Sequence, residues 1–159
     1  MTHTALHVPE EYLDLLNRAV ARELSVSIQY MLQHSKIEGA LKKRISEANI
    51  LNDKTTFDVL AKMFEDIAIV EMEHAEEIAE RIFILNGEAT TKPDPMPVVG
   101  SSIEEFLKLG IAAEEEALAL YKEIIKETMK IGDYTTRQLF MKIYKEEEDH
   151  LIKFQEYLS

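Results

Sequence analysis

The segments Glu71-Met72-Glu73-His74 and Glu147-Glu148-Asp149-His150 share the pattern Glu-x-x-His and decide how this sequence is interpreted. Residues three apart on an α-helix lie on one face, with Cβ atoms about 5–6 Å apart, so each glutamate–histidine pair can reach one small ion. Apolar residues surround both pairs at helical spacing: Phe64, Ile67, Ala68, Ala75 and Ile78 in the first case, and Phe140, Ile143, Tyr144, Leu151 and Phe154 in the second. Both pairs are therefore expected to point into a helical core.

Two further carboxylates lie in apolar stripes of this kind. Glu23 is flanked by Ala19, Val20 and Val26, and Glu114 by Leu107, Ile111 and Leu118. A buried carboxylate is costly unless it is paired or bound to a metal. Each of these glutamates is followed seven residues later by a tyrosine, Tyr30 or Tyr121, which indicates an internal repeat. The repeat predicts two half-sites and hence two metal ions.

The predicted metal site thus offers four carboxylates and two imidazoles, from Glu23, Glu71, His74, Glu114, Glu147 and His150. Hard oxygen and borderline nitrogen ligands suit iron or manganese better than a tetrahedral zinc site. The chain has no cysteine, which excludes disulfides, iron–sulfur clusters and thiolate zinc sites. The other acidic residues near these ligands, including those of Glu146–Asp149, are assigned mostly to the solvated face.

Length and composition fit one globular domain spanning residues 1–159. Of its residues 46% are apolar and 30% charged, and the formal net charge is −12. That charge argues against binding to nucleic acid or to anionic membranes, because either needs clustered Lys and Arg. The sequence contains no signal-peptide pattern and no apolar run long enough to cross a bilayer, so we expect a cytoplasmic location.

Apolar residues recur at helical spacing nearly throughout, which predicts an all-α fold. We expect helices over about 8–39, 57–86, 102–131 and 133–158, with a polar connection at 40–56 that has room for a short helix. Pro9 suits a first helical turn, Asn86-Gly87 a helix end, and Ser102-Ile103-Glu104-Glu105 a capping box.

The connection after the second helix contains Pro93, Pro95 and Pro97, which favour an extended chain. The second helix should be roughly 43 Å long at about 1.5 Å per residue. A link of about 14 residues at about 3.3 Å each can span roughly 46 Å, so it can return along the bundle. Helices two and three should therefore run parallel, and the short turn at Gly132 should make helices three and four antiparallel neighbours.

From Glu23 to the C-terminus the sequence resembles the bacterioferritins. The resemblance rests on Ala21-Arg22-Glu23-Leu24 with Gln29-Tyr30, on 71–75, 80–87, 133–137 and 146–150. It implies a ferritin-like four-helix bundle with one long crossover between helices 2 and 3. It places the six residues above on the ferroxidase ligands and Tyr30 on the nearby tyrosine. Tyr30 is then either a catalytic residue or, like Tyr121, a core tyrosine whose hydroxyl bonds to a glutamate ligand. The implied reaction is oxidation of Fe(II) to Fe(III) by oxygen or peroxide at an intrasubunit diiron site, for iron storage or detoxification.

Some features depart from bacterioferritin. The chain ends nine residues after His150, so we expect no fifth helix, and the first connection is longer. These departures leave open a homodimer, a twelve-subunit cage or a 24-subunit cage. Met72 is rotated about 100° from Glu71, off the metal-facing stripe. In bacterioferritins the methionine at this position binds a haem shared by two subunits, so Met72 is either a haem ligand or an apolar interface residue.

Two other functions fit the same residues. One is a non-storage diiron redox enzyme working as a dimer, such as a rubrerythrin-like peroxidase or an oxygenase. A substrate pocket beside the metal site and the absence of a cage would favour it. The other is a non-catalytic helical interaction protein, in which Glu147 and His150 could be replaced without any change in metal content.

Overall fold

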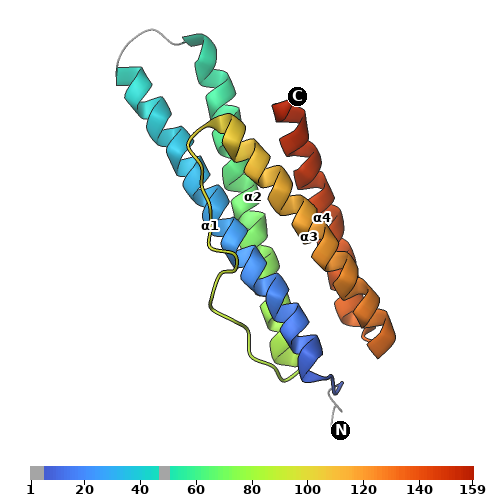
Figure 1. The fold of residues 1–159 in the computed structure, drawn as a ribbon. Helices are drawn as coiled ribbons and strands as arrows, with labels where there is room; N and C mark the ends of the chain where they lie inside the picture. The colour runs from blue at the N-terminus through green and yellow to red at the C-terminus, as the bar shows by residue number, and fades with distance from the viewer. Residues whose placement is uncertain (1–5, 47–50) are drawn as a thin grey trace.

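The computed structural model describes residues 6–46 and 51–159, with side chains for 6–43 and 56–159. Over these ranges the chain forms four helices and no strand: α1 (Glu10–Ser46), α2 (Leu51–Ile84), α3 (Ile103–Ile131) and α4 (Tyr134–Leu158). Helix α1 packs along α2 and α3 along α4, and the two pairs meet through α1–α3 and α2–α4 contacts (Figure 1). The all-α four-helix bundle predicted from periodicity is confirmed. None of these helices is long and apolar enough to cross a membrane.

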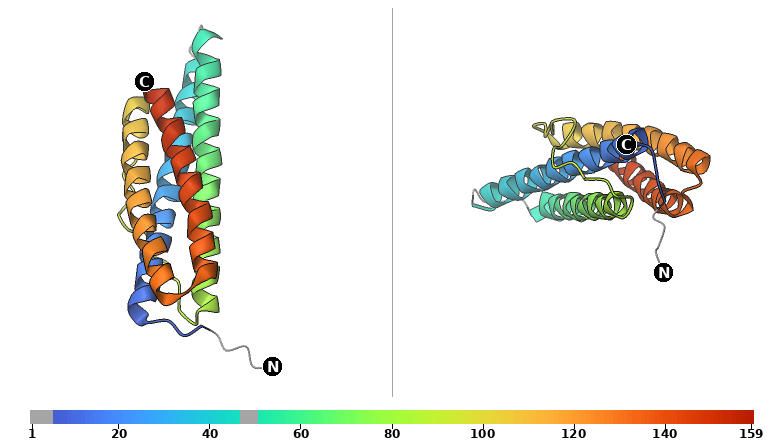
Figure 2. Two further views of the ribbon diagram at one scale, coloured as in Figure 1. Left: turned by 90° about the vertical axis from the view of Figure 1, so that its right-hand side faces the viewer. Right: turned by 90° about the horizontal axis from the view of Figure 1, so that it is seen from below.

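The first two helices are longer than predicted. The expected polar connection at 40–56 is wrong over most of its length, because α1 continues to Ser46 and α2 begins at Leu51. The polar residues of this stretch, among them Asn49, Asn52 and Asp53, indicated a connection. The residues that follow Gly39, Ala-Leu-Lys-Lys-Arg at 40–44, are good helix formers and carry the helix onward. The C-terminal end of α1 and the N-terminal end of α2 thus extend beyond α3 and α4 (Figure 2). The part of the predicted connection at 47–50 lies outside the described residues.

The crossover between α2 and α3 returns along α1, as its length predicted. Four side chains of α1 donate hydrogen bonds to backbone carbonyls of the crossover, and their partners follow the same order along the chain. The pairs are Asn17 with Glu88, Ser25 with Pro95, Gln33 with Val99 and Lys36 with Gly100. The crossover therefore runs parallel to α1, which makes α3 parallel to α2 (Figure 1). Polar side chains of α1 supply the partners that an extended chain cannot find within itself.

Caps fix where α3 and α4 begin. Ser102 Oγ accepts a hydrogen bond of 3.1 Å from Glu105 N, and Glu105 in turn accepts from the backbone N–H of Ser101. Gly132 ends α3 at φ 80°, a left-handed conformation that glycine adopts without strain. Asp133 then caps α4 by accepting from Thr136 N at 3.1 Å. The turn is short, so α3 and α4 pair as antiparallel neighbours.

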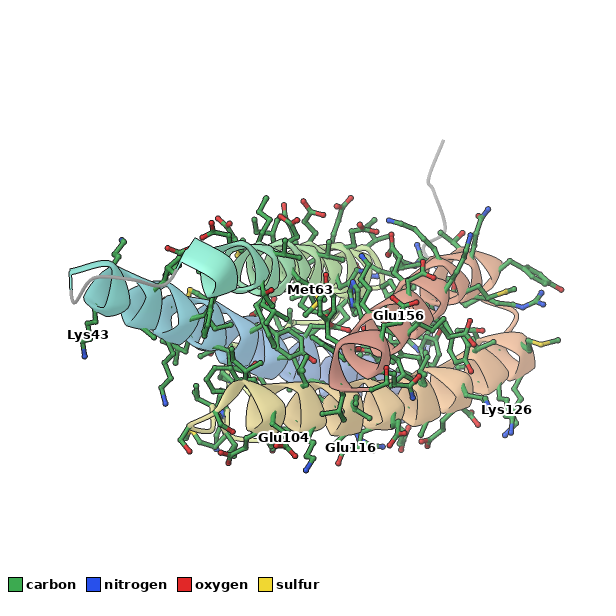
Figure 3. The ribbon with its side chains drawn as sticks, turned by 90° about the horizontal axis from the view of Figure 1, so that it is seen from above. Lys43, Met63, Glu104, Glu116, Lys126 and Glu156 are labelled. Carbon is green, nitrogen blue, oxygen red and sulfur yellow. The ribbon has the colours of Figure 1, made fainter. Side chains whose placement is uncertain are left out.

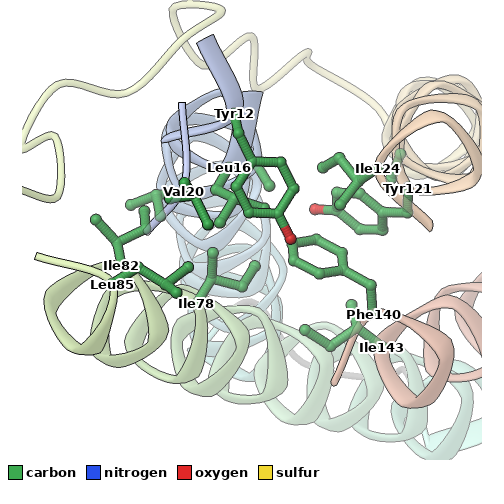
Figure 4. Close-up of a cluster of buried hydrophobic side chains, with 13 residues drawn as sticks. Tyr12, Leu16, Val20, Ile78, Ile82, Leu85, Tyr121, Ile124, Phe140 and Ile143 are labelled. Atoms are coloured by element: carbon green, nitrogen blue, oxygen red, sulfur yellow. The ribbon is translucent and has the colours of Figure 1, made fainter. Parts of the chain in front are cut away.

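Two apolar clusters fill the bundle, one toward each end. The first includes Leu16, Val20, Ile78, Ile82, Tyr121, Ile124, Phe140 and Ile143 (Figure 4). The second includes Val26, Tyr30, Ile67, Phe64, Leu107 and Phe154. Along each helix one glutamate separates the residues of the first cluster from those of the second: Glu23, Glu71, Glu114 and Glu147. The bundle therefore contains a polar layer between two apolar ones.

Candidate metal centre

The six residues predicted as metal ligands lie together in this polar layer. Their ligand atoms form two groups, and within each group all atoms lie within 4.8 Å of one another. One group is Glu23, Glu71, His74 and Glu147; the other is Glu71, Glu114, Glu147 and His150. Every member is at most 4% exposed. In contrast, Glu104, Glu116 and Lys126 of α3 point outward from the bundle (Figure 3).

Glu71 and Glu147 belong to both groups because each presents one oxygen to each histidine. Glu71 Oε2 lies 3.0 Å from His74 Nδ1, and its Oε1 lies 3.0 Å from His150 Nδ1. Glu147 Oε1 lies 3.0 Å from His74 Nδ1, and its Oε2 lies 3.3 Å from His150 Nδ1. Two carboxylates in this position can bridge two ions, one on each side.

Glu23 and Glu114 each belong to one ligand group, Glu23 to that of His74 and Glu114 to that of His150. Glu23 Oε2 is 3.7 Å from His74 Nδ1, and Glu114 Oε1 is 3.9 Å from His150 Nδ1. Each is also held by a tyrosine from the other half of the chain, since Tyr121 donates to Glu23 and Tyr30 to Glu114. The repeat in the sequence thus corresponds to two half-sites of matching composition.

Sequence reasoning missed one residue of this site. Glu146 was assigned mostly to the solvated face, yet its Oε2 lies 2.7 Å from His74 Nε2, on the side of the ring away from the centre. The Glu146 side chain is 38% exposed, so it also reaches solvent. No spacing within α4 could have indicated this contact, because it joins α4 to α2.

Burial and mutual repulsion disturb the ionisation of the carboxyl groups. Burial, together with the charges of Glu114 and Glu23, raises the pKa of Glu71 from 4.5 to about 8. Burial and the charge of Glu147 raise the pKa of Glu114 well above its ordinary value. For Glu23, burial acts upward, but hydrogen bonding and attraction to His74 outweigh it, so the pKa is lowered. Without a metal, this site holds fewer than four negative charges near neutral pH.

Burial lowers the pKa of a histidine, whereas it raises the pKa of a carboxyl group. Burial favours neutral imidazole, but hydrogen bonds to Glu147 and Glu71 raise the pKa of His150 from 6.5 to about 10. Hydrogen bonds to Glu147, Glu23 and Glu71 likewise outweigh burial and raise the pKa of His74. In the metal-free protein, protons on these rings therefore balance part of the carboxylate charge.

The donor set fits a pair of metal ions. Two buried carboxylate oxygens, Glu23 Oε2 and Glu147 Oε1, face His74 Nδ1 at 3.7 and 3.0 Å but accept no well-aligned hydrogen bond. A buried polar atom without a partner is costly, and a cation between these groups would satisfy both oxygens. Oxygen-rich sites with a few imidazoles select iron and manganese over metals that prefer sulfur.

Met72 lies off this site, as its position in the helix predicted. It is 57% exposed and lines a pocket of about 360 Å³ on the outer face of α1 and α2. Met31 and Ile69 line the same pocket. The pocket is therefore mainly apolar and does not contain the six residues of the metal centre.

Comparison with known proteins identifies relatives. Residues 13–159 match the family model of the ferritin-like domain. A bacterioferritin from Desulfovibrio desulfuricans is 32% identical over 143 residues, which cover 90% of this chain and 72% of that protein. A bacterioferritin from Brucella melitensis is 30% identical over 139 residues, covering 87% of this chain and 77% of the relative.

A solved structure supports the same grouping. The X-ray structure of D. desulfuricans bacterioferritin, described as showing the diiron site in different catalytic states, aligns with a TM-score of 0.79 and 30% identity. The alignment covers 93% of this chain and 78% of the other. These matches confirm the resemblance that the sequence motifs indicated.

Proposed function

This chain belongs to the ferritin-like family, with bacterioferritins among its relatives, and from that membership we propose that it is a diiron ferroxidase. It oxidises Fe(II) to Fe(III) at the centre between its helices, for iron storage or detoxification. The observation that carries the proposal is the position of Glu71 and Glu147, each of which presents one oxygen to His74 and the other to His150. A single buried ion pair would not need two carboxylates shared in this manner.

We assign a role to each ligand. Glu71 and Glu147 bridge the two ions, Glu23 and Glu114 are terminal ligands, and His74 and His150 bind one ion each. Each Fe(II) is a substrate that gives up one electron to the oxidant, oxygen or peroxide. With both imidazoles neutral, four ionised carboxylates balance the charge of two Fe(II). The protons that the metal-free site retains must therefore leave as iron binds.

For Tyr30 we propose a part in the reaction itself. Its hydroxyl is buried and donates to Glu114 at 2.6 Å, so it lies next to a terminal ligand. Burial and the charge of Glu114 raise the pKa of Tyr30 well above 10, so the phenol keeps its proton until an electron is removed. An oxidisable phenol bonded to a terminal ligand supports this role for Tyr30.

The alternative, a non-storage diiron enzyme such as a rubrerythrin-like peroxidase or an oxygenase, shares the metal centre. An oxygenase needs a pocket for its organic substrate next to that centre. Four pockets lined by described residues contain none of the six proposed ligands. None of these four pockets therefore offers an organic substrate a position beside the six ligands.

Further assignments follow from the donor set and from Met72. Manganese is a second candidate for the same oxygen-rich site. We propose that the chain forms a homo-oligomer, a dimer or a cage of 12 or 24 subunits, and that it stays in the cytoplasm.

The exposed Met72 thioether in an apolar pocket fits a haem held between two copies of the chain. Addition of haemin to the protein and to Met72→Ala tests this assignment by absorption spectroscopy.

The proposed activity is tested by adding Fe(II) to the metal-free protein in air while following oxygen uptake and Fe(III) absorbance. The wild type should oxidise Fe(II) faster than buffer alone, and the double variant Glu147→Ala/His150→Ala should not. The exposed variant Glu148→Ala is the matched control. Equal rates in the double variant and the wild type would reject the ferroxidase, and unchanged metal content would favour an interaction protein.

Iron loading separates storage from other redox functions. After a large excess of Fe(II) in air followed by desalting, a storage protein retains far more iron than its binding sites can hold. Retention of only the two ions of the centre per chain would remove the storage role and favour the non-storage enzyme.

A further inference from the structure

The two histidines of the centre differ in what contacts the nitrogen that faces away from it. His74 Nε2 lies 2.7 Å from Glu146 Oε2. In the part of the chain that the structure describes, His150 forms ion pairs through Nδ1 alone. The half-site of His74 is thus supported by a carboxylate that the half-site of His150 lacks.

Among the described residues, the hydrogen bond and the ion pair printed for the Glu146 carboxylate are both to His74. The nearby cation Lys142 bonds both oxygens of Glu77, at 2.9 Å each, and feels the charge of Glu146 without a hydrogen bond to it. On the same helix, Glu148 and Asp149 are exposed and form no ion pair within the described residues. The contact with His74 is therefore specific to Glu146 among the acidic residues of this segment.

A neutral imidazole carries one N–H, and its other nitrogen is free to bind a metal. Once metal binding has displaced the proton from Nδ1, donation of the remaining Nε2–H to Glu146 leaves the Nδ1 lone pair directed toward Glu71 and Glu147. A carboxylate that orients a histidine ligand in this manner strengthens metal binding, and its loss costs about 10- to 100-fold in affinity.

We propose that Glu146 is a positioning residue that fixes the ring and the Nε2–H tautomer of His74. As a result, the half-site of Glu23, Glu71, His74 and Glu147 binds its ion more tightly than the half-site of Glu71, Glu114, Glu147 and His150. The inference rests on the proposed dinuclear function and specifies which of the two positions fills first.

Calorimetric titration of the metal-free protein with Co(II) tests the inequality. The wild type should bind two ions in two resolved steps. Glu146→Ala should weaken the tighter step by about tenfold or more and leave the weaker step unchanged. Glu146→Gln retains an oxygen that accepts from Nε2–H, so it should restore the tighter step. Glu148→Ala should match the wild type.

Unchanged binding in Glu146→Ala would overturn the proposal. Equal weakening of both steps, or the same weakening in Glu148→Ala, would also overturn it, because either result would indicate a general effect of charge on the site. A wild type that binds no Co(II) would instead count against the proposed metal centre.

The position of the ring is tested independently of any metal by nitrogen-15 NMR of the labelled histidines in the metal-free protein. The Nε2–H proton of His74 should exchange slowly with solvent in the wild type and in Glu146→Gln, and rapidly in Glu146→Ala. Rapid exchange in the wild type, or slow exchange in Glu146→Ala, would contradict the positioning role even if metal binding were normal.

Discussion

The hydroxyl of Tyr30 donates a hydrogen bond of 2.6 Å to Glu114 Oε1, which joins α1 to α3 across the centre of the bundle. Tyr121 of α3 donates to Glu23 of α1 in the same manner. Each tyrosine therefore holds the terminal carboxylate of the opposite repeat. Both rings are fully buried. Tyr30 packs at a tilt against Phe154 and Tyr121 edge-on against Phe140, each at a centroid distance of 5.4 Å.

This symmetry provides a matched test of Tyr30. Phenylalanine at either position removes one hydrogen bond to a buried carboxylate, which should cost about 1–3 kcal/mol of unfolding free energy in both variants. If Tyr30 takes part in the reaction, Tyr30→Phe should also slow Fe(II) oxidation more than Tyr121→Phe does. Stopped-flow absorbance measures both rates. Equal losses would assign both tyrosines to holding their carboxylates.

The shared carboxylates should behave differently from the terminal ones. Glu71 and Glu147 belong to both ligand groups, so Glu71→Ala or Glu147→Ala should weaken the binding of both ions. Glu23→Ala and Glu114→Ala should each weaken one ion and spare the other. Titration with Co(II), followed by its visible absorption, counts the ions retained by each variant. Loss of a single ion in Glu71→Ala would contradict the bridging assignment.

The metal-free protein should become less stable as the pH rises. Glu71 has an ordinary pKa of 4.5 and a native pKa of about 8, so its contribution to stability is complete below 4.5 and lost as the pH rises through 8. His150, shifted from 6.5 to about 10, contributes fully below 6.5 and loses its contribution as the pH rises through 10. Both groups therefore destabilise the folded state as the pH rises, so the free energy of unfolding should fall between pH 6.5 and 10.

Urea unfolding of the metal-free protein across this range checks the sign. Metal affinity should rise over the same range, because binding must displace these protons. The Glu71→Gln variant is the control, since it removes one of the two titrating groups and should flatten the profile. Stability that rises with pH in the metal-free wild type would contradict the proton distribution described above.

Asp133 connects three helix ends away from the metal centre. It caps α4, accepts a hydrogen bond from Tyr12 of α1 at 2.9 Å and pairs with Arg81 of α2 at 2.8 Å. Asp133→Ala removes the cap and leaves Arg81 without its partner, which should cost about 3 kcal/mol in urea unfolding. The exposed Asp149→Ala on the same helix should change stability by less than about 0.5 kcal/mol. Similar losses of stability in both variants would show that the contacts of Asp133 contribute little to the free energy of unfolding.

Much of this centre could be predicted because its physical signal is local. A carboxylate in an apolar stripe stands out against its neighbours, and Glu23, Glu71, Glu114 and Glu147 all lie in such stripes. Helix starts at Ser102 and Asp133 were predictable for the same reason, since a capping side chain bonds to the backbone three residues on.

Contacts between helices could not be predicted in the same manner. The bond from His74 to Glu146 depends on how α2 and α4 pack, and no spacing within either helix specifies it. The run of α1 past Gly39 was not predicted because the residues at 40–56 are mostly polar, although Ala-Leu-Lys-Lys-Arg at 40–44 are good helix formers. In both cases the structure depends on several residues acting together, which no single residue or spacing in the sequence indicates.

The most direct test of the account is an anaerobic titration of the metal-free protein with Fe(II), followed by admission of oxygen. The account predicts saturation at two Fe(II) per chain, one for each ligand group, and oxidation of both ions when oxygen enters. Saturation at one ion or none, or two bound ions that stay Fe(II) in oxygen, would contradict it.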